Sequence, residues 1–246
     1  MDESATAVRS VGAEGQNGAV YRERPSALPG AVVWTGVSGP SSRILPDGCM
    51  DLMWRGESLL VAGPDSRAYV HEGSATYTGL RLPPGAAPLL LGVPADALRD
   101  QRVRLDDVWS PRRVRPLEER LAASPAPGLG LERLVADLVG PDDPRSHGVR
   151  DLVEALDAGV AIAEAAARTG FSARQLHRRC LAAFGYGPKV LARILRMQRA
   201  LAQVRAGTPG AEAAADSGYA DQPHLARDVR ALTGTTLGVL AGAGAA

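Results

Sequence analysis

The sequence is poor in cysteine and has no long apolar segment. Cys49 and Cys180 are the only two cysteines in 246 residues, and no CxxC spacing occurs. We therefore expect neither a disulfide framework nor a structural zinc site. No apolar run approaches the roughly 18 residues of a membrane span, and the acidic start at Met1–Ser4 lacks the apolar core of a signal peptide. These absences predict a cytoplasmic protein with no membrane partner.

Lysine is nearly absent as well, and the formal net charge is only +1, which argues against a generic polycation. The charge is unevenly distributed, however. From Arg145 onward the chain has 13 Lys and Arg against 8 Asp and Glu, a net charge of +5, whereas the preceding part has a net charge of −4. A moderately basic carboxy-terminal part suits a polyanionic partner, whereas the acidic part does not.

The most informative feature present is an internal repeat. The octapeptide EAAARTGF at Glu164–Phe171 is restated as EAAADSGY at Glu212–Tyr219, and each copy leads into an amphipathic segment, at 172–184 and 221–232. A short Ala-rich helix, a Gly-aromatic turn and a second helix make the helix-turn-helix layout, which places one helix in a DNA groove. Two copies in register predict double-stranded DNA as the partner.

The second helix of each copy has a recognisable start and two distinct faces. Ser172 and Gln175 are expected to form a capping box, and Asp221 to be the N-cap of the second copy. The core-facing positions are Leu176, Cys180 and Phe184 in copy one and Leu225, Val229 and Leu232 in copy two. The outward positions are Arg174, His177, Arg178 and Arg179, and then Gln222, His224, Arg227 and Arg230. Arg and Gln near a helix N-terminus suit bidentate contacts to guanine and adenine edges.

A long helix at Pro188–Ala206 is expected to join the two copies, with Arg193, Arg196 and Arg199 on its exposed face. About 18 residues span about 27 Å, which is of the order of the ~34 Å between successive major-groove faces. Contacts to the DNA backbone are predicted for Arg179, Arg196 and Arg230. Any one of these arginines is equally compatible with a solvated surface charge.

Residues 150–240 resemble the carboxy-terminal domain of AraC/XylS-type transcriptional regulators. The motif IAEAAARTGFSARQLHRRCLAAFG at Ile162–Gly185 is similar to the family's first unit, and GYADQPHLARDVRALTG at Gly218–Gly234 to its second. The resemblance implies two helix-turn-helix units on one long helix, bound to consecutive major grooves. It places the base-reading positions at Arg174, His177, Arg178, Gln222, Pro223, His224 and Arg227.

The second unit departs from the family pattern. Val229 stands where Phe is usual, Leu225 is often aromatic in relatives, and Leu237 replaces the usual Pro. Pro223 has no side-chain donor. We therefore expect the second unit to be more poorly packed than the first and a weaker reader of DNA.

The amino-terminal part has a different pattern, in which short apolar runs alternate with Pro and Gly turns. These runs predict five strands, at Ala31–Thr35, Cys49–Trp54, Ser58–Ala62, Ala68–Val70 and Tyr77–Leu82. Strands at this spacing predict a small barrel or sandwich. Helical spacing then predicts helices at Ala95–Arg102, Val114–Ala123 and Leu129–Val139. The run at 88–94 fits either a strand or the lead-in to a helix, and Leu129–Val139 either packs on the β-rich domain or forms a homodimer.

The expected fold class is therefore α+β. We predict a disordered tail at 1–18, a β-rich regulatory domain with following helices at 19–139, a linker at 140–148, an all-α domain of two helix-turn-helix units at 149–240, and a tail at 241–246. Residues 20–125 resemble a β-rich domain found on one branch of the same family. The matching stretches are Leu45–Leu52, Val61–Asp65 and Leu80–Pro94.

Regulators of this kind normally carry a sensing domain, so we expect a small-molecule effector, and RNA polymerase as a partner if the protein activates. Trp34, Trp54, Tyr69 and Tyr77 are the candidates to line the effector pocket, although aromatics in a β-rich domain are more often plain core. Cys49 is a candidate sensor thiol, but the neighbouring Asp47 and Asp51 would raise a thiol pKa and favour an inert, buried side chain. A metal site made of these residues and His71 has no diagnostic spacing.

The leading hypothesis is a sequence-specific transcription factor modulated by an effector, without catalytic residues, metal or cofactor. One alternative is a DNA-reading domain fused to a transferase, repair or electrophile-sensing domain that depends on Cys49. Another is an architectural regulator that responds to no ligand.

Overall fold

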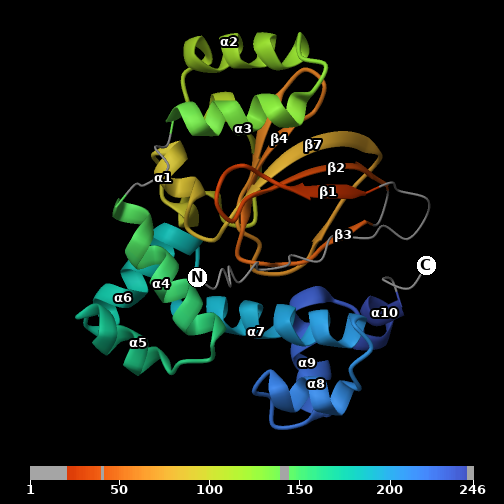
Figure 1. Cartoon of the computed structure of the whole chain (residues 1–246), viewed down its shortest axis with the longest axis vertical. Helices are drawn as coiled ribbons and strands as arrows, with labels where there is room; N and C mark the ends of the chain where they lie inside the picture. Colours follow the sequence, from red (N-terminus) through yellow and green to blue (C-terminus); the bar gives the residue numbers. More distant parts are fainter. Residues whose placement is uncertain (1–20, 40–41, 139–143, 243–246) are drawn as a thin grey trace, which may run out of the picture.

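The computed structural model describes residues 21–39, 42–138 and 144–242. It has two parts, a β-rich part and a helical part, stacked along the longest axis (Figure 1). The strands are β1 (Arg22–Pro25), β2 (Val32–Ser38), β3 (Arg43–Ile44), β4 (Met50–Trp54), β5 (Leu59–Ala62), β6 (Tyr69–Val70), β7 (Ala75–Leu82) and β8 (Arg102–Arg104). The predicted α+β class and the order of its two parts are confirmed.

The β-rich part is built on one antiparallel six-stranded sheet, ordered β1-β2-β7-β4-β5-β8, with β3 and β6 paired separately. Its register places a row of apolar residues side by side across the sheet: Val33, Leu80, Leu52, Val61 and Val103. Alternation along each strand sends these side chains to one face. This face is the core of the β-rich part, and the opposite face carries Trp34, Met53 and Tyr77.

The helices that cover the apolar face follow the sheet in sequence. They are α1 (Ala87–Leu91), the 3-10 turns η1 (Ala95–Leu98) and η2 (Leu105–Asp107), α2 (Pro111–Ala122) and α3 (Pro127–Leu138). Leu131, Leu134 and Val135 of α3 are buried in the core of the sheet, so this helix packs on the β-rich domain, as one of the two interpretations predicted. Leu129 and Leu138 of the same helix stay exposed.

The helical part contains α4 (Pro144–Asp157), α5 (Ile162–Thr169), α6 (Ala173–Phe184), α7 (Pro188–Arg205), α8 (Gly210–Asp216), α9 (Gln222–Thr233) and α10 (Leu237–Gly242). One apolar cluster joins residues of every helix from α4 to α10. In Figure 1, α7 runs across the molecule with α5 and α6 near one end and α8 and α9 near the other. Among the described residues, none of the helices combines the length and apolarity needed to cross a membrane.

Several expectations from the sequence need correction. The segment predicted as one helix at Ala95–Arg102 is a single 3-10 turn followed by β8, because its end pairs with the edge of the sheet beside β5. The run at 88–94 is largely the helix α1. Strands β1, β3 and β8 are short edge or ribbon strands without an alternating apolar pattern, and the sequence did not indicate them.

The predicted domain limits differ from the helix bounds at two places. The helix α4 begins at Pro144, inside the predicted linker, since proline is tolerated in the first turn of a helix. The predicted tail at 241–246 begins with the last two residues of α10. The predicted tail at 1–18, residues 140–143 of the linker and residues 243–246 lie outside the described residues.

A partly buried ion pair between β1 and α3 predicts how stability depends on pH. Arg24 bonds both carboxylate oxygens of Glu132, at 3.0 and 2.6 Å, and lowers the pKa of Glu132 from 4.5 to about 2. Because the folded pKa lies below the unfolded one, the stabilisation is complete above about pH 4.5 and is lost as the pH falls towards 2. We expect Glu132→Gln to remove this part of the pH dependence.

Chemical denaturation of both proteins from pH 5 to pH 2 tests this prediction. The difference in free energy of unfolding between the natural protein and Glu132→Gln should become smaller as the pH falls. A difference that stays constant over this range would show that Glu132 does not titrate with a lowered pKa.

Candidate nucleic-acid interface

The repeated octapeptide forms the same structure twice. The helix α5 ends at Gly170 and α6 follows, and α8 ends before Gly218 and α9 follows. Both glycines have positive φ, +68° and +81°, a conformation that costs other residues energy because of the clash at Cβ. The predicted helix-turn-helix pair is therefore present.

Local hydrogen bonds fix where each second helix begins. In α6 the Ser172 hydroxyl accepts from the Gln175 amide at 3.3 Å, and the Gln175 side chain accepts from the Ser172 amide at 2.9 Å. In α9 the Asp221 carboxylate accepts from the His224 amide at 2.6 Å. The capping box and the second N-cap, both predicted from the sequence, are confirmed. Each helix therefore starts at a defined residue, which fixes the direction of its side chains.

The inner faces of α6 and α9 join one apolar cluster. Leu176, Cys180 and Phe184 of α6 and Leu225, Val229 and Leu232 of α9 are all buried, as the sequence predicted. The expectation of a more poorly packed second unit is wrong at the level of burial, because Leu225 and Val229 are both fully buried. Tyr219 from the preceding turn belongs to the same cluster and helps to close it.

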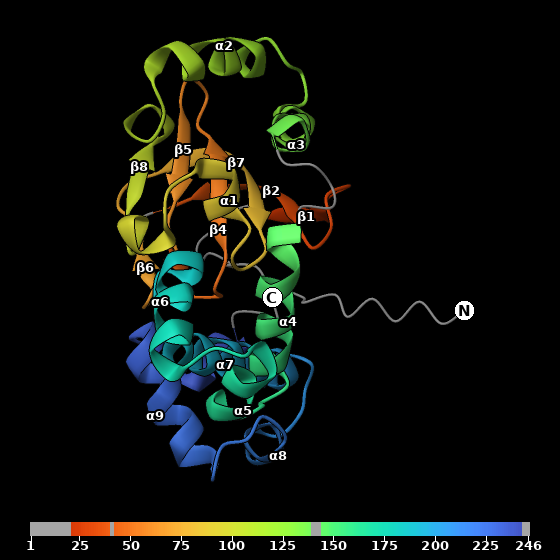
Figure 2. The ribbon, with the colours of Figure 1, turned by 90° about the vertical axis from the view of Figure 1, so that its left-hand side faces the viewer.

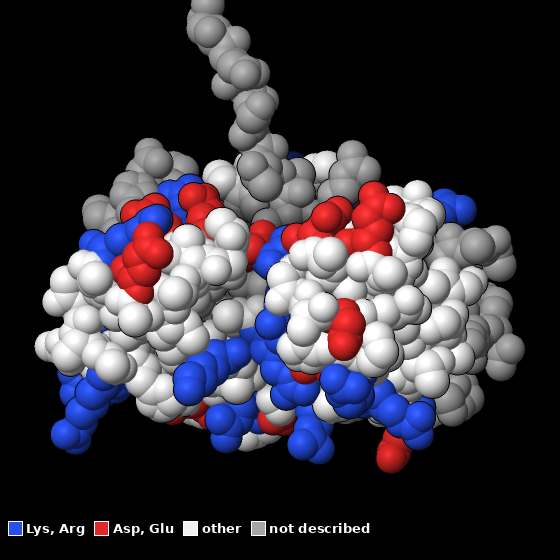
Figure 3. All heavy atoms as spheres, turned by 90° about the horizontal axis from the view of Figure 1, so that it is seen from below, with Lys and Arg blue, Asp and Glu red and all other residues white. Residues whose placement is uncertain are grey.

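The outer faces of α6 and α9 look towards the same side of the molecule. Figure 2 shows both helices on one side of the helical part, and in Figure 3 Lys and Arg gather along that side, at the lower edge of the view. The exposed residues of these two faces are Arg174, His177, Arg178, Arg179, Gln222, Pro223, Arg227 and Arg230. The predicted reading residues are thus brought to one surface, with the exception of His224, which is half-buried.

The side chains of the predicted base-reading residues differ in the contacts that they make with the rest of the protein. The His224 ring packs edge-on against Tyr219 with centroids 5.1 Å apart, and its Nδ1 accepts from the Ala220 amide at 3.4 Å. The Gln222 side chain lies close to Gly210, where an added Cβ would be 2.9 Å from its Nε2. Within the described part of the chain, no hydrogen bond or ion pair is recorded for Arg178 or Arg227. The same holds for the exposed side chains of Arg174 and Arg230, so all four arginines are available as donors.

The arginines of α7 are not the exposed row that the sequence suggested. Arg193 pairs with Asp228 of α9, and Arg196 approaches the same carboxylate at 3.5 Å while its guanidinium stacks 4.2 Å from the centre of the Tyr219 ring. Arg199 pairs with Asp157 of α4 at 2.7 Å. The three side chains therefore connect α7 to the helices on both sides of it.

Asp228 is the residue of this region that sequence reasoning missed. It is buried, and besides the two arginines it accepts a hydrogen bond from the Tyr219 hydroxyl at 3.0 Å. Burial first, and then the Asp228 charge, raise the pKa of Tyr219, so this hydroxyl stays a donor. The sequence does contain a sign of this role, because Asp228 directly precedes Val229 and lies among the core-facing positions Leu225, Val229 and Leu232.

The corresponding position in copy one is Arg179, which is 49 residues earlier. Its guanidinium lies 4.1 Å from the centre of the Phe171 ring. In both copies, therefore, this position of the second helix contacts the aromatic residue of the turn. The contact is a cation–π interaction in one copy and a hydrogen bond in the other.

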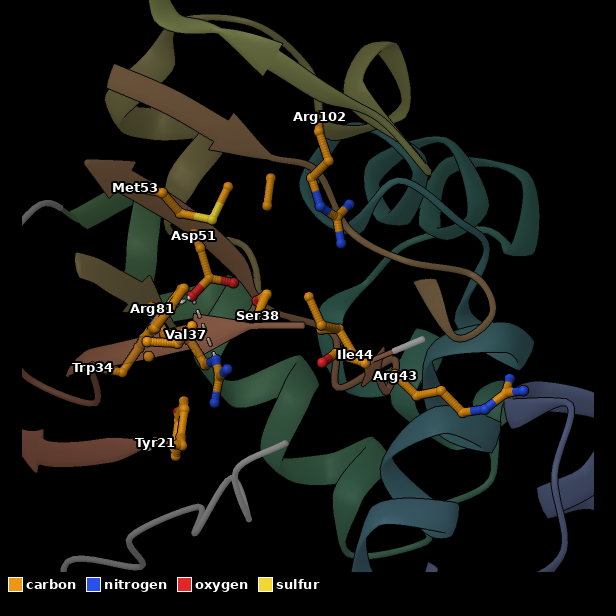
Figure 4. Close-up of a pocket in the computed structure, with 13 residues that line it drawn as sticks. Tyr21, Trp34, Val37, Ser38, Arg43, Ile44, Asp51, Met53, Arg81 and Arg102 are labelled. Atoms are coloured by element: carbon orange, nitrogen blue, oxygen red, sulfur yellow. Dashed lines mark hydrogen bonds and ion pairs between the residues drawn. The ribbon is translucent and has the colours of Figure 1, made fainter. Parts of the chain in front are cut away.

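A cavity of about 60 Å³ lies on the face of the sheet that bears Trp34 (Figure 4). Of the four aromatics proposed as pocket-lining residues, Trp34 lines this cavity. Trp54 belongs to the core, Tyr77 packs in a small cluster with the cavity-lining Trp34 and Met53, and Tyr69 stacks on Arg102 at 4.2 Å. The other lining residues are Tyr21, Gly36, Val37, Ser38, Ser42, Arg43, Ile44, Asp51, Met53, Ala62, Arg81 and Arg102.

A charged cluster that includes the cavity-lining Arg81 and Asp51 influences the pKa of the Cys49 thiol. Arg81 is buried and faces Asp47 at 3.4 Å and Asp51 at 3.6 Å. Burial and the neighbouring Asp47 raise the pKa of the Cys49 thiol, and burial raises the pKa of Asp47. A protonated thiol is a poor nucleophile, so this environment does not favour Cys49 as a sensor or acceptor thiol. Among the described residues there is no cluster of three or more His, Cys, Asp or Glu able to hold a metal.

Residues 165–241 match the family described as "Helix-turn-helix domain", and residues 31–104 match "Domain of unknown function (DUF6597)". No curated protein matches the chain. The chain is similar to the structure of a probable AraC family transcriptional regulator from Rhodopseudomonas palustris, at 27% identity and a TM-score of 0.35, covering 39% of this chain and 96% of that one. It is also similar to ToxT from Vibrio cholerae, at 7% identity and a TM-score of 0.47, covering 87% and 97%. For ToxT bound to an unsaturated fatty acid the values are 9%, 0.46, 85% and 94%.

Proposed function

We propose that the chain is a DNA-binding transcriptional regulator of the AraC/XylS type that reads its operator with α6 and α9 in two consecutive major grooves. The observation that carries this proposal is that α6 and α9 lie on one side of the molecule (Figure 2), along which Lys and Arg gather (Figure 3). The helix α7 between them has 18 residues, a length of about 27 Å by the rise per residue. That is compatible with the ~34 Å between groove faces.

The proposed roles follow from exposure and from existing contacts. Arg174 and Arg178 of α6 and Arg227 of α9 are exposed and take the base contacts, because arginine reads guanine through two parallel hydrogen bonds. His177 and Gln222 extend the reading faces. Arg230 is placed at a phosphate, which fixes position but confers no sequence preference.

Binding measured as a function of salt tests the DNA-reading proposal. Duplexes selected from a random library should bind the full chain at least about a thousandfold more tightly than unselected duplexes. The affinity should fall steeply with added salt, because phosphate contacts release counterions. Equal affinity for selected and unselected duplexes would contradict sequence-specific reading.

We further propose that a small molecule bound in the cavity of the β-rich part modulates this DNA binding. Tyr21, Trp34 and Met53 offer an apolar surface, while Arg43 and Ser42 offer hydrogen-bond donors. This mixture of an apolar wall and a few polar groups is typical of ligand sites. The volume of about 60 Å³ is well below the roughly 300–1,000 Å³ of pockets for drug-sized ligands. The proposal is therefore for a small ligand, since a drug-sized one requires the cavity to widen.

Thermal unfolding with a panel of small apolar molecules that bear one polar group tests the effector proposal. A ligand at 100 times its Kd should stabilise the native state by about 2.7 kcal/mol and change the affinity for a selected duplex. The variant Ile44→Trp, which fills the cavity, should lose both effects. A panel that changes neither property would favour the regulator that responds to no ligand.

A further inference from the structure

The two helices proposed to read DNA end in the same way. The helix α6 ends at Gly185 and α9 ends at Gly234, and both glycines are left-handed, with φ of +80° and +69°. At each end, carbonyl groups accept hydrogen bonds from the β-rich part of the chain. The carbonyls at the end of a helix have no partner within the helix, so these contacts satisfy groups that would otherwise need water.

At the end of α6 the donor is Arg99, which follows η1. Its Nη1 donates to the Gly185 carbonyl at 3.2 Å. The approach of the two parts is close, because a Cβ added to Gly185 would lie 2.6 Å from Cγ of Pro64 and 3.3 Å from the Ala95 carbonyl oxygen. The carboxyl end of α6 is therefore packed directly against the β-rich part.

At the end of α9 there are two donors, both close to the ribbon of β3 and β6. The Ala68 amide donates to the Leu232 carbonyl at 2.7 Å, and Nη1 of Arg43 donates to the Thr233 carbonyl at 3.3 Å. An arginine at the carboxyl end of a helix also interacts favourably with the helix dipole. Each reading helix is thus capped by an arginine of the β-rich part.

A third contact lies between these two ends. The Gln198 side chain of α7 donates to the Pro46 carbonyl at 2.7 Å, and Leu45 packs against the apolar cluster of the helical part. The β-rich part therefore contacts α6, α7 and α9 at once. None of the proposed reading residues takes part in these hydrogen bonds, so the contacts leave the DNA-facing side chains uncovered.

We propose that the β-rich part is a brace that sets the relative placement of the two reading helices, with Arg43 and Arg99 as its positioning residues. The helix α7 connects the two units along one line, and the brace adds a second connection between their carboxyl ends. Because Arg43 also lines the cavity, a ligand there would act on the end of α9. This inference rests on the proposed reading by α6 and α9.

The test compares operators that differ only in spacing. A selected operator is made in three versions, with the two read segments at their natural separation or one base pair closer or farther apart. We expect the full-length natural protein to bind the natural spacing more tightly than the altered spacings. In the double variant Arg43→Ala/Arg99→Ala, this ratio of affinities should be smaller by at least about threefold. The ratio of affinities does not depend on the fraction of protein that is folded, so a purely structural loss leaves it unchanged.

Two further proteins complete the experiment. Arg43→Lys/Arg99→Lys keeps both charges and should restore part of the preference. Arg112→Ala/Arg120→Ala removes two exposed arginines of α2 and should leave it unchanged. If the natural protein prefers one spacing and the alanine variant keeps the same ratio of affinities, the proposed positioning role of the β-rich part is wrong, while the proposal of DNA reading by α6 and α9 is unaffected. If the natural protein shows no preference for any sequence or spacing, the DNA reading fails, and the brace fails with it.

Discussion

Replacing Asp228 by Ala is expected to destabilise the protein by about 2–3 kcal/mol and to weaken DNA binding. The substitution leaves Arg193, Arg196 and the Tyr219 hydroxyl without the buried carboxylate that joins them. Removing one partner of a buried ion pair costs about 3–5 kcal/mol. The two arginine side chains are 40% and 30% exposed. Water therefore compensates part of that loss, and we expect about 2–3 kcal/mol rather than the full cost of a buried pair. Chemical denaturation of the full chain measures this effect.

Two control variants separate the charge from the shape of Asp228. Asp228→Asn keeps the volume and one acceptor, so it should cost less than the alanine variant. Asp216→Ala removes an exposed carboxylate of α8 and should change stability by no more than about 0.5 kcal/mol. An Asp228→Ala protein that is as stable as the Asp216→Ala protein would contradict the role assigned to this network.

Replacing Arg178 by Ala should remove the preference for one base pair, at a cost of about 1–3 kcal/mol on the selected operator. Arg227→Ala should do the same at a different base pair, because the two arginines occupy equivalent positions in α6 and α9. Neither side chain has a recorded hydrogen bond or ion pair within the described residues, so we expect stability to change little. Competition binding against operators altered one base pair at a time measures both effects.

The neighbouring Arg179 supplies the contrast for this prediction. Its guanidinium stacks on Phe171 and is not assigned a base. Arg179→Ala should therefore change the affinity for all duplexes by a similar factor. If Arg178→Ala also weakened binding equally on every sequence, Arg178 would be a phosphate contact.

The elements that the sequence predicted best are those defined by local patterns. The repeat is visible as two similar octapeptides. The capping box at Ser172 and the apolar faces of α6 and α9 depend on residues three or four apart, a spacing that indicates a helix. Five strands were placed for the same reason, since each alternates or carries a short apolar run between turn residues. The strand β1 (Arg22–Pro25) is exposed along its whole length and leaves no such pattern.

The features that could not be predicted depend on partners distant in sequence. The sequence pattern predicted that Arg193 and Arg196 are exposed on α7, because their partner, Asp228, lies more than 30 residues away. The arginines that cap α6 and α9 come from the β-rich part, 86 and 190 residues away from the carbonyls they bond. The four aromatics proposed for the pocket were chosen by residue type alone, and the folding of the sheet placed one of them, Trp34, at the cavity.

The most direct test of the account is a selection of binding sites from a random DNA library by the full-length protein. We predict that the aligned sites contain two preferred segments whose centres lie about 10–10.5 base pairs apart, one for α6 and one for α9. The same selection with Arg178→Ala should lose preference in one segment, and with Arg227→Ala in the other. Sites with a single preferred segment, or two variants that affect the same segment, would contradict reading by both helices.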